Sequence, residues 1–202
     1  MLTDYLLGIW AFYLALRLYP EGKATRQKCT GLWSLFLFAT GIAALIGGTA
    51  HGFDPYFTDR TREIIWKSTL YFILIASFFF LAGSIVAFFQ GLYKRLFLIA
   101  ATVKFALFSI WIVSNPDFKF AIYDYAGSMA IVLILQVTAK IKSGEKSAAW
   151  IIAGIVISLI GAAVQQSGID LHEHFNHNDL YHVIQIVVFY LWYRGARLLR
   201  DG

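Results

Sequence analysis

Residues 63–90 decide the fold, and they read EIIWKSTLYFILIASFFFLAGSIVAFFQ. From Ser68 onward this stretch has no charged side chain, and most of its residues are aliphatic or aromatic. A helix needs about 20 mostly apolar residues to cross the roughly 30 Å hydrocarbon core of a bilayer. The stretch is therefore long enough to span a membrane with some tilt, or to project beyond it.

Apolar segments of similar length recur along the whole chain. Together they predict an all-α fold, a bundle of seven transmembrane helices that forms a single domain over residues 1–202. The other six segments are residues 3–19, 31–50, 96–114, 118–140, 147–166 and 179–199.

The composition also indicates a membrane protein. Hydrophobic residues make up 59% of the 202 residues and charged residues 14%, and the mean hydropathy is +0.65. A water-soluble domain usually has about 25% charged residues. The chain has too few charged residues for a water-exposed surface, so we expect a multi-pass integral protein of the cell (inner) membrane.

Basic residues gather in alternate connections between the seven segments. The first, third and fifth connections and the stretch after the seventh segment are rich in them, whereas the sixth connection has none. Because Lys and Arg mark the cytoplasmic side, we expect the N-terminus outside and the C-terminus in the cytoplasm. The basic set is Lys23, Arg26, Lys28, Lys94, Arg95, Lys140, Lys142, Lys146, Arg194, Arg197 and Arg200.

Several other classes of protein are disfavoured. The net charge of +5 comes from short loops and not from one basic face, so we expect no nucleic-acid partner. The single cysteine, Cys29, excludes an internal disulfide and a cysteine-based zinc site. The first apolar segment has no basic leader and is interpreted as a helix, not as a cleaved signal peptide. Residues 179–199 contain no lysine, so the Schiff base of a retinal protein cannot form there.

All five histidines fall at the outer face in this topology, although they come from distant parts of the sequence. Imidazole is the commonest metal-ligating side chain, and three imidazoles with an open position for water describe a catalytic zinc site. We therefore expect one zinc ion at this face. The histidines are His51, His172, His174, His177 and His182.

Helix geometry limits which groups near the seventh segment can cooperate. Asn178 and His182 are four residues apart and share a helix face, whereas His177 and His182 are five apart and lie about 140° from each other. His177 can join His182 on one ion only if it precedes the helix, as it would with Asn178 or Asp179 as the N-cap. We favour His177 as the second ligand, with Asn178 and His174 as the alternatives.

Other ionisable residues also lie within the predicted spans, among them Lys67 about one turn into the third, Lys104 near the middle of the fourth and Asp124 in the fifth. Such groups are costly in lipid and usually face the bundle interior. One interpretation is a Lys104–Asp124 ion pair. The other is that Asp124 orients a ligand histidine or accepts a proton near the metal.

Seven spans with an outside N-terminus, a histidine ending the second span and a histidine pair opening the seventh resemble the CREST superfamily. This superfamily includes alkaline ceramidases and the progestin and adiponectin receptors. The resemblance implies zinc bound by a histidine of span two and by an H-x-x-x-H motif of span seven. It also implies that a zinc-bound water, helped by an aspartate and a serine, cleaves a lipid amide.

On this chain His51 matches the histidine of span two, and His182 matches the second histidine of span seven. The first histidine of that motif is replaced by Asn178, and the family serine by Gly47, with Thr49 as the closest hydroxyl. The family aspartate has no in-frame match. The candidates in the preceding loop are Asp54 and Asp59.

The leading hypothesis is a zinc-dependent, ceramidase-like hydrolase of an amide or ester in a membrane lipid. His51, His182 and His177 would bind the ion, with Asp124 or Asp179 as the base or orienting group. The alternative is a non-enzymatic seven-helix transporter, or a receptor that binds lipid or metal. The ionisable pair within the spans and the histidine-rich loop favour this alternative.

Overall fold

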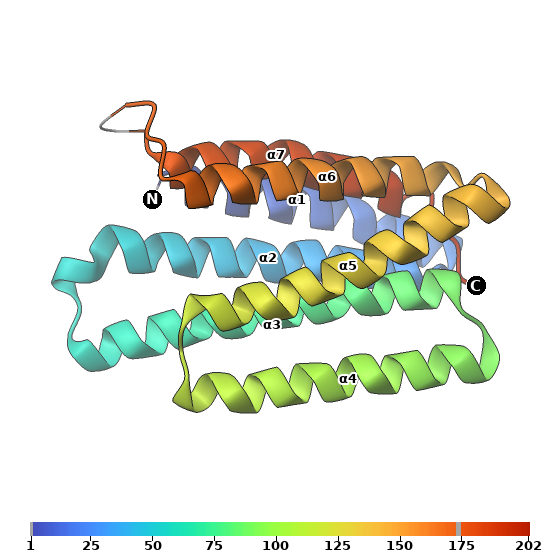
Figure 1. Ribbon diagram of the computed structural model, residues 1–202, viewed down its shortest axis with the longest axis horizontal. Helices are drawn as coiled ribbons and strands as arrows, with labels where there is room; N and C mark the ends of the chain where they lie inside the picture. The colour runs from blue at the N-terminus through green and yellow to red at the C-terminus, as the bar shows by residue number, and fades with distance from the viewer. Residues whose placement is uncertain (1, 173–174) are drawn as a thin grey trace.

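The computed structural model of the chain describes residues 2–172 and 175–202. Over these residues the chain forms seven α-helices and one short 3₁₀ helix (Figure 1). No β-sheet forms among the described residues, where one isolated bridge joins His172 to Phe175. The all-α prediction is confirmed. The helices are α1 (Leu2–Thr25), α2 (Lys28–Phe53), η1 (Asp54–Tyr56), α3 (Asp59–Phe88), α4 (Gly91–Ser114), α5 (Phe118–Ser143), α6 (Lys146–Ser167) and α7 (His177–Ala196).

Five of the described helices, α2 to α6, are long and apolar enough to cross a membrane. Helices α1 and α7 have 24 and 20 residues, so they also reach roughly 30 Å at 1.5 Å per residue. Both carry more charge; α1, for example, contains Asp4, Arg17 and Glu21. The fold is therefore compatible with an integral membrane protein.

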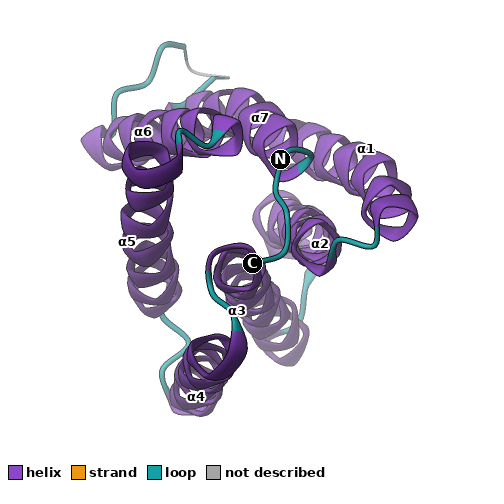
Figure 2. Cartoon of the chain, turned by 90° about the vertical axis from the view of Figure 1, so that its right-hand side faces the viewer, coloured by secondary structure: helices purple, strands orange, loops and turns teal. Residues whose placement is uncertain are grey.

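Six of the helices form a closed ring in the order α1, α2, α3, α5, α6, α7, and each packs against the next (Figure 2). The remaining helix, α4, lies outside this ring and packs against α3 and α5. Its outward side chains are large and apolar, including Leu107, Ile110 and Val113. A helix with so little buried surface would expose a hydrophobic stripe to water, so lipid is its natural surrounding.

Successive helices run in opposite directions, so their connections lie alternately at the two ends of the bundle (Figure 1). The end that contains the N-terminus and the α2–α3, α4–α5 and α6–α7 connections is called the histidine end. The opposite end, with the C-terminus and the other three connections, is called the basic end because it holds the basic set named above. The structure thus brings together residues that are distant in sequence.

Most of the helices are longer than the predicted segments. A run of apolar residues shows which part of a helix can cross lipid, but it does not show where the helix begins and ends. Helix α1 continues through Pro20 to Thr25. Helix α5 continues to Ser143 and ends where Gly144 adopts a left-handed conformation, φ 64°. Helix α7, in contrast, ends before residue 199, because the amides of Leu198 and Leu199 bond to carbonyls three residues back in tighter turns.

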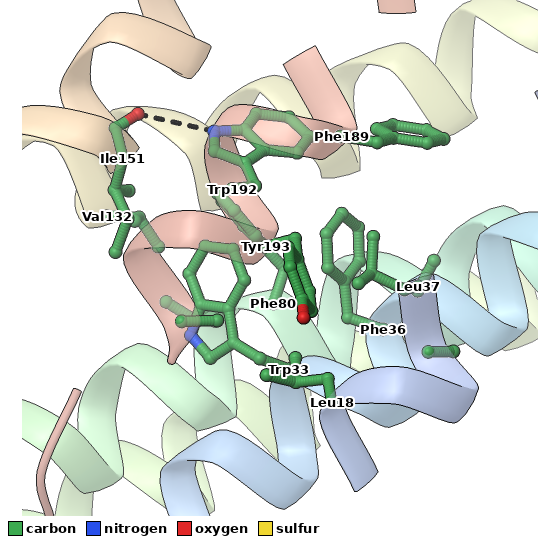
Figure 3. Close-up of a cluster of buried hydrophobic side chains, with 14 of the residues drawn as sticks. Leu18, Trp33, Phe36, Leu37, Phe80, Val132, Ile151, Phe189, Trp192 and Tyr193 are labelled. Atoms are coloured by element: carbon green, nitrogen blue, oxygen red, sulfur yellow. Dashed lines mark hydrogen bonds between the residues drawn. The ribbon is translucent and has the colours of Figure 1, made fainter. Parts of the chain in front are cut away.

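Aromatic side chains fill the centre of the ring (Figure 3). Trp33 lies edge-on to Phe80 with ring centroids 4.9 Å apart, and Trp192 of α7 lies 5.2 Å from Phe80. The Trp192 indole also donates a hydrogen bond to Ile151 O in α6, N···O 3.2 Å. Each such aromatic pair contributes roughly 0.5–1.5 kcal/mol beyond its buried area, so α2, α3 and α7 are held to one another at this level.

Helices α1 and α7 lie side by side and run in the same direction. Three contacts fix their register, from Thr3 to Asp179, from Trp10 to Ile186 and from Arg197 to Glu21, and each joins residues 176 positions apart. The first turns of the two helices therefore meet at the histidine end. This register places Thr3 and Asp4 beside the start of α7.

Candidate functional site

The start of α7 is fixed by a reciprocal pair of side-chain caps. Asn176 is the N-cap, and its side chain accepts hydrogen bonds from the amides of Asn178 and Asp179. Asp179 in turn accepts from the amide of Asn176, 3.2 Å. This capping box satisfies amides that have no partner inside the helix. The expected N-cap, Asn178 or Asp179, was wrong, and His177 is the first helical residue.

Thr3 connects α7 to α1. Its hydroxyl donates to Asp179 Oδ1 at 2.5 Å and lies 3.1 Å from His182 Nδ1. A hydroxyl has one proton to donate, and the short contact to the carboxylate uses it. His182 Nδ1 is therefore the protonated nitrogen and donates to Thr3, which orients the imidazole.

The other ring nitrogen of His182 faces a carboxylate. His182 Nε2 lies 3.5 Å from Asp4 Oδ1. Both side chains are largely buried, with 15% of His182 and 8% of Asp4 exposed. Burying an acidic residue and a histidine in an apolar bundle is costly, and such residues usually have a functional role.

The separation between these two atoms fits a metal site. Two ligands at about 2.0–2.1 Å from one ion, at a tetrahedral angle, lie roughly 3.3–3.4 Å apart. Metal-ligating histidines usually donate their second ring N–H to a group that orients them. His182 does so through Thr3 to Asp179. Within the described residues, no three His, Cys, Asp or Glu side chains already converge as a preformed ligand set.

His51, at the end of α2, lies close enough to His182 for the two imidazoles to interact electrostatically. Its own ring is exposed and stands edge-on to Trp66 at 6.1 Å. It lines a cavity of about 330 Å³ together with apolar walls from Phe57, Ile65 and Trp66. His51 therefore lines an open, largely apolar cavity and also acts electrostatically on His182.

Thr49 occupies the opposite side of the same helix end. Its hydroxyl donates to Leu45 O at 2.8 Å, so the Tyr5 hydroxyl, 2.9 Å away, donates to Thr49. This contact ties α2 to α1. The Thr49 hydroxyl proton is donated to a backbone carbonyl, as is common for threonine within a helix.

His177 and Asn178 form hydrogen bonds with residues of the α6–α7 connection and of α6. His177 Nδ1 pairs with Asp170 Oδ1 at 2.8 Å, and Asn178 Oδ1 accepts from Gln165 Nε2 at 2.9 Å. The hydrogen bond from His177 lowers the pKa of the Asp170 carboxyl. Because His177 is helical, the angle of about 140° predicted from residue spacing applies and separates it from His182. His174 lies outside the described residues.

Asp124 is in a different part of the bundle. Its carboxylate forms an ion pair with Lys104, whose ammonium also donates to Asp124 O at 3.1 Å. Ser77 and Ser128 lie against this pair and hydrogen-bond to each other at 2.8 Å. The ion-pair interpretation is confirmed, and it leaves the Asp124 carboxylate directed at Lys104.

Thr3 and Asp4 were not identified as site residues from the sequence. A signal was present, since Asp4 is an acidic residue in an apolar segment, and the alternation of basic loops places it at the same face as the histidines. The pairing of the first and last helices could not be read from the sequence. That pairing alone brings Asp4 to His182.

Comparison with known proteins identifies a family. Residues 1–201 match a family of unknown function, DUF6962, and the chain therefore belongs to it. No curated protein matches the chain. No solved structure matches it either.

Proposed function

For this member of a family of unknown function, we propose a membrane-embedded, zinc-dependent hydrolase that cleaves an amide or ester in a membrane lipid. His182, Asp4 and His51 would bind the ion at the histidine end. The observation that carries the proposal is the buried His182–Asp4 pair, with its two facing atoms 3.5 Å apart.

The chemical type of the ligand atoms agrees with this assignment. Zinc in catalytic sites takes imidazole nitrogen and carboxylate oxygen, with one position open to substrate or water. His182 and Asp4 offer one of each, and His51 would add an exposed imidazole that already acts electrostatically on His182. When bound, zinc supplies a hydroxide nucleophile at neutral pH and polarises the scissile carbonyl.

Thr3 and Asp179 orient the site. Asp179 is held by the Thr3 hydroxyl on one oxygen and by the Asn176 amide on the other, so it cannot rotate freely. Through Thr3 it fixes the tautomer and direction of His182, as carboxylates do behind many metal-bound histidines. Asp179 is therefore a positioning residue, and Asp124 in its ion pair takes no part in the site.

The substrate class follows from the cavity beside His51. Its apolar walls of Phe57, Ile65 and Trp66 suit an acyl chain near its linkage, and the Arg62–Asp54 ion pair forms a polar rim. The cavity lies at the histidine end of a bundle whose outer surface is apolar. A lipid could place its amide or ester beside His51 while its chains stay in the hydrocarbon.

The topology proposed with this function has seven spans, with the N-terminus outside and the C-terminus in the cytoplasm. Exposed apolar stripes on the two more polar helices support it, since Leu6, Ile9 and Leu16 of α1 and Val183 and Val187 of α7 would otherwise face water. The basic residues at the opposite end support the orientation. The site would then open to the non-cytoplasmic face.

The test is turnover by the detergent-purified chain. A panel of an N-acyl sphingoid amide, a phospholipid ester and a triacylglycerol is supplied, and released fatty acid is measured by mass spectrometry. We expect release from at least one lipid, abolished by a chelator and restored by zinc. Asp4→Asn and His182→Ala should reduce the rate roughly a hundred-fold or more.

His177→Ala and Asp117→Asn are the matched controls, because each removes the same chemical group at the same end, and the partners of these residues, Asp170 and Lys119, are not part of the proposed site. Both should keep the wild-type rate. A folded, zinc-loaded protein that releases no fatty acid from any member of the panel would contradict the hydrolase assignment. Equal losses in the control variants would contradict the assigned ligands.

The second candidate function is transport. It is favoured by the polar cluster of Lys104, Asp124, Ser77 and Ser128, which joins α3, α4 and α5 within the bundle. Ionisable residues inside transmembrane bundles often mark ion pathways. Uptake of zinc or protons into liposomes that contain the protein, lost in Asp124→Asn but without lipid turnover, would favour this candidate.

A further inference from the structure

Arg194 lies in the last turn of α7, at the basic end, and is held by aromatic side chains of two helices. Its guanidinium carbon lies 4.7 Å from the ring centroid of Trp150 in α6 and 5.8 Å from that of Tyr190 in α7. One terminal nitrogen also donates to the Tyr190 hydroxyl at 3.0 Å. Because stacking on an aromatic ring fixes the plane of a guanidinium, the N–H groups of Arg194 are held in one orientation.

The charge of Arg194 is not neutralised by the protein. Among the residues that the structure describes, no carboxylate pairs with it, and its other N–H groups are not enclosed. The acidic residues of the neighbouring elements are placed elsewhere. Glu21 of α1 pairs with Arg197 at 2.6 Å, and Glu145 lines a cavity towards α5 together with Lys142. Arg194 is therefore a pre-oriented cation with donors that an external anion can reach.

A second cation lies on the same side of α6. Lys146 is exposed and precedes Trp150 by four residues, so the two side chains share a helix face. The indole is thus flanked by an ammonium and a guanidinium. The guanidinium fork matches phosphate oxygens, and tryptophan and tyrosine are typical of the headgroup level of a membrane. This combination suits the phosphate of a lipid.

An apolar stripe leads from Arg194 towards the middle of α7. Val183, Val187 and Tyr190 are 42%, 50% and 40% exposed, and their spacing of four and three residues places them with Arg194 on one face. Eleven residues separate Val183 from Arg194, roughly 16 Å at 1.5 Å per residue. This length is close to one leaflet, half of the roughly 30 Å hydrocarbon core. The stripe therefore matches one acyl chain below a headgroup.

We propose that this face of α6 and α7 binds one phospholipid with net negative charge, in the leaflet at the basic end. The phosphate lies between Arg194 and Lys146, with Trp150 and Tyr190 at the level of the glycerol. One acyl chain follows Val187. A choline or ethanolamine headgroup would add a third cation beside the first two, so zwitterionic lipids bind less tightly. The site is independent of the histidine end and of the hydrolase assignment.

Native mass spectrometry of the detergent-purified chain, with a chelator present to prevent hydrolysis, measures binding of phosphatidylglycerol and phosphatidylcholine with identical acyl chains. We expect phosphatidylglycerol to bind more tightly. Arg194→Gln and Lys146→Gln should each weaken its binding roughly five-fold. Arg26→Gln and Lys140→Gln are the matched controls, because they remove the same charges from exposed positions at the same end. Both should leave the affinity within about two-fold of wild type.

Equal affinity of the wild type for the two lipids would overturn the proposal, as would equal effects of Arg194→Gln and Arg26→Gln. Lys146 is exposed, so Lys146→Gln compared with Lys140→Gln keeps the test valid if Arg194→Gln fails to fold. Glycerophosphoglycerol, the same headgroup without acyl chains, should bind at least about ten-fold more weakly than phosphatidylglycerol, because no acyl chain is buried. Equal binding of these two would identify a site for a soluble phosphate ester and contradict the lipid assignment.

Discussion

Thr3 has one hydroxyl proton and two neighbours, the Asp179 carboxylate at 2.5 Å and the His182 ring at 3.1 Å. Because the carboxylate takes the proton, Thr3 can only accept from His182, and it fixes which ring nitrogen faces Asp4. Thr3→Val keeps the shape of the side chain and removes the hydroxyl. We expect zinc affinity to fall about ten- to a hundred-fold, measured by competition with a fluorescent chelator.

Thr3→Ser provides the control, since it retains the hydroxyl and should keep most of the zinc affinity. A Thr3→Val protein with unchanged affinity would show that the Asp179–Thr3–His182 chain has no orienting role. Asp179 would then serve only as the N-terminal capping residue of α7.

Asp201 has a comparable role at the basic end, where it accepts hydrogen bonds from the first two amides of α2. Burial alone would raise the pKa of Asp201, but its hydrogen bonds with Cys29 and Lys28 outweigh burial and lower it. A carboxyl with a lowered pKa stabilises the fold above its unfolded value of about 4 and loses this effect as the pH falls through the folded value.

Asp201→Ala should therefore lower the free energy of unfolding by about 1 kcal/mol at pH 7. The difference from wild type should shrink as the pH falls below about 4 and through the lowered pKa of the folded state. Thermal unfolding in detergent across this pH range measures both effects. Asp59→Ala is the control, because the Asp59 side chain is fully exposed. A difference between Asp201→Ala and wild type that does not change with pH would contradict the capping role.

At the residue scale, the sequence predicted the histidine end but only part of its site. His177 was favoured as the second ligand on the condition that it precedes the helix, but Asn176 is the N-cap, so His177 is helical and diverges from His182. The ion pair between Lys104 and Asp124 was also foreseen. Asp4 was missed, since nothing in a single sequence shows that the first and last helices lie in register.

At the scale of elements, α6 and α7 approach closely because Gly154 faces the indole of Trp192. A Cβ atom at Gly154 would lie 2.4 Å from Trp192 Nε1, well inside van der Waals contact. Gly154→Ala must displace the indole and weaken its hydrogen bond to Ile151 O. We expect a loss of about 1–3 kcal/mol in the free energy of unfolding, measured by unfolding in mixed micelles.

Gly127→Ala is the matched control, because no atom lies within 4 Å of a Cβ at that helical position. It should be neutral or slightly stabilising, since alanine favours helix over glycine. If the two variants lose the same stability, the close contact between α6 and α7 is not what Gly154 provides.

The helices themselves could be predicted more fully than their ends. Runs of apolar residues identified all seven, because a bilayer-length helix has a strong sequence signal. Their ends depend on single caps, such as Gly144 for α5 and Asn176 for α7. Near each of these helix ends several polar residues could act as the cap, and hydropathy does not show which of them does.

At the scale of the whole molecule, the alternating connections place Lys142 and the C-terminus at one end and Asp170 at the other (Figure 1). We expect tags near Lys142 and at the C-terminus to be cytoplasmic and a tag near Asp170 to be external. Accessibility to a membrane-impermeant reagent in intact cells measures this. Labelling of the Asp170 and C-terminal tags from the same side would contradict the seven-span topology.

The order of helices around the ring could not be predicted from hydropathy, which is similar for α2 to α6. It follows from side-chain shape, with Trp33, Phe80 and Trp192 filling the centre and α4 left outside. The His182–Asp4 pair depends on this order, because closing the ring between α1 and α7 joins Asp4 to His182.

The zinc content of the purified, monodisperse chain, measured by elemental mass spectrometry, tests the metal centre most directly. We predict about one zinc ion per wild-type or His177→Ala chain, and roughly a tenth of that or less in Asp4→Asn and His182→Ala. A folded wild-type protein without bound metal, or full zinc occupancy in Asp4→Asn, would contradict the proposed site.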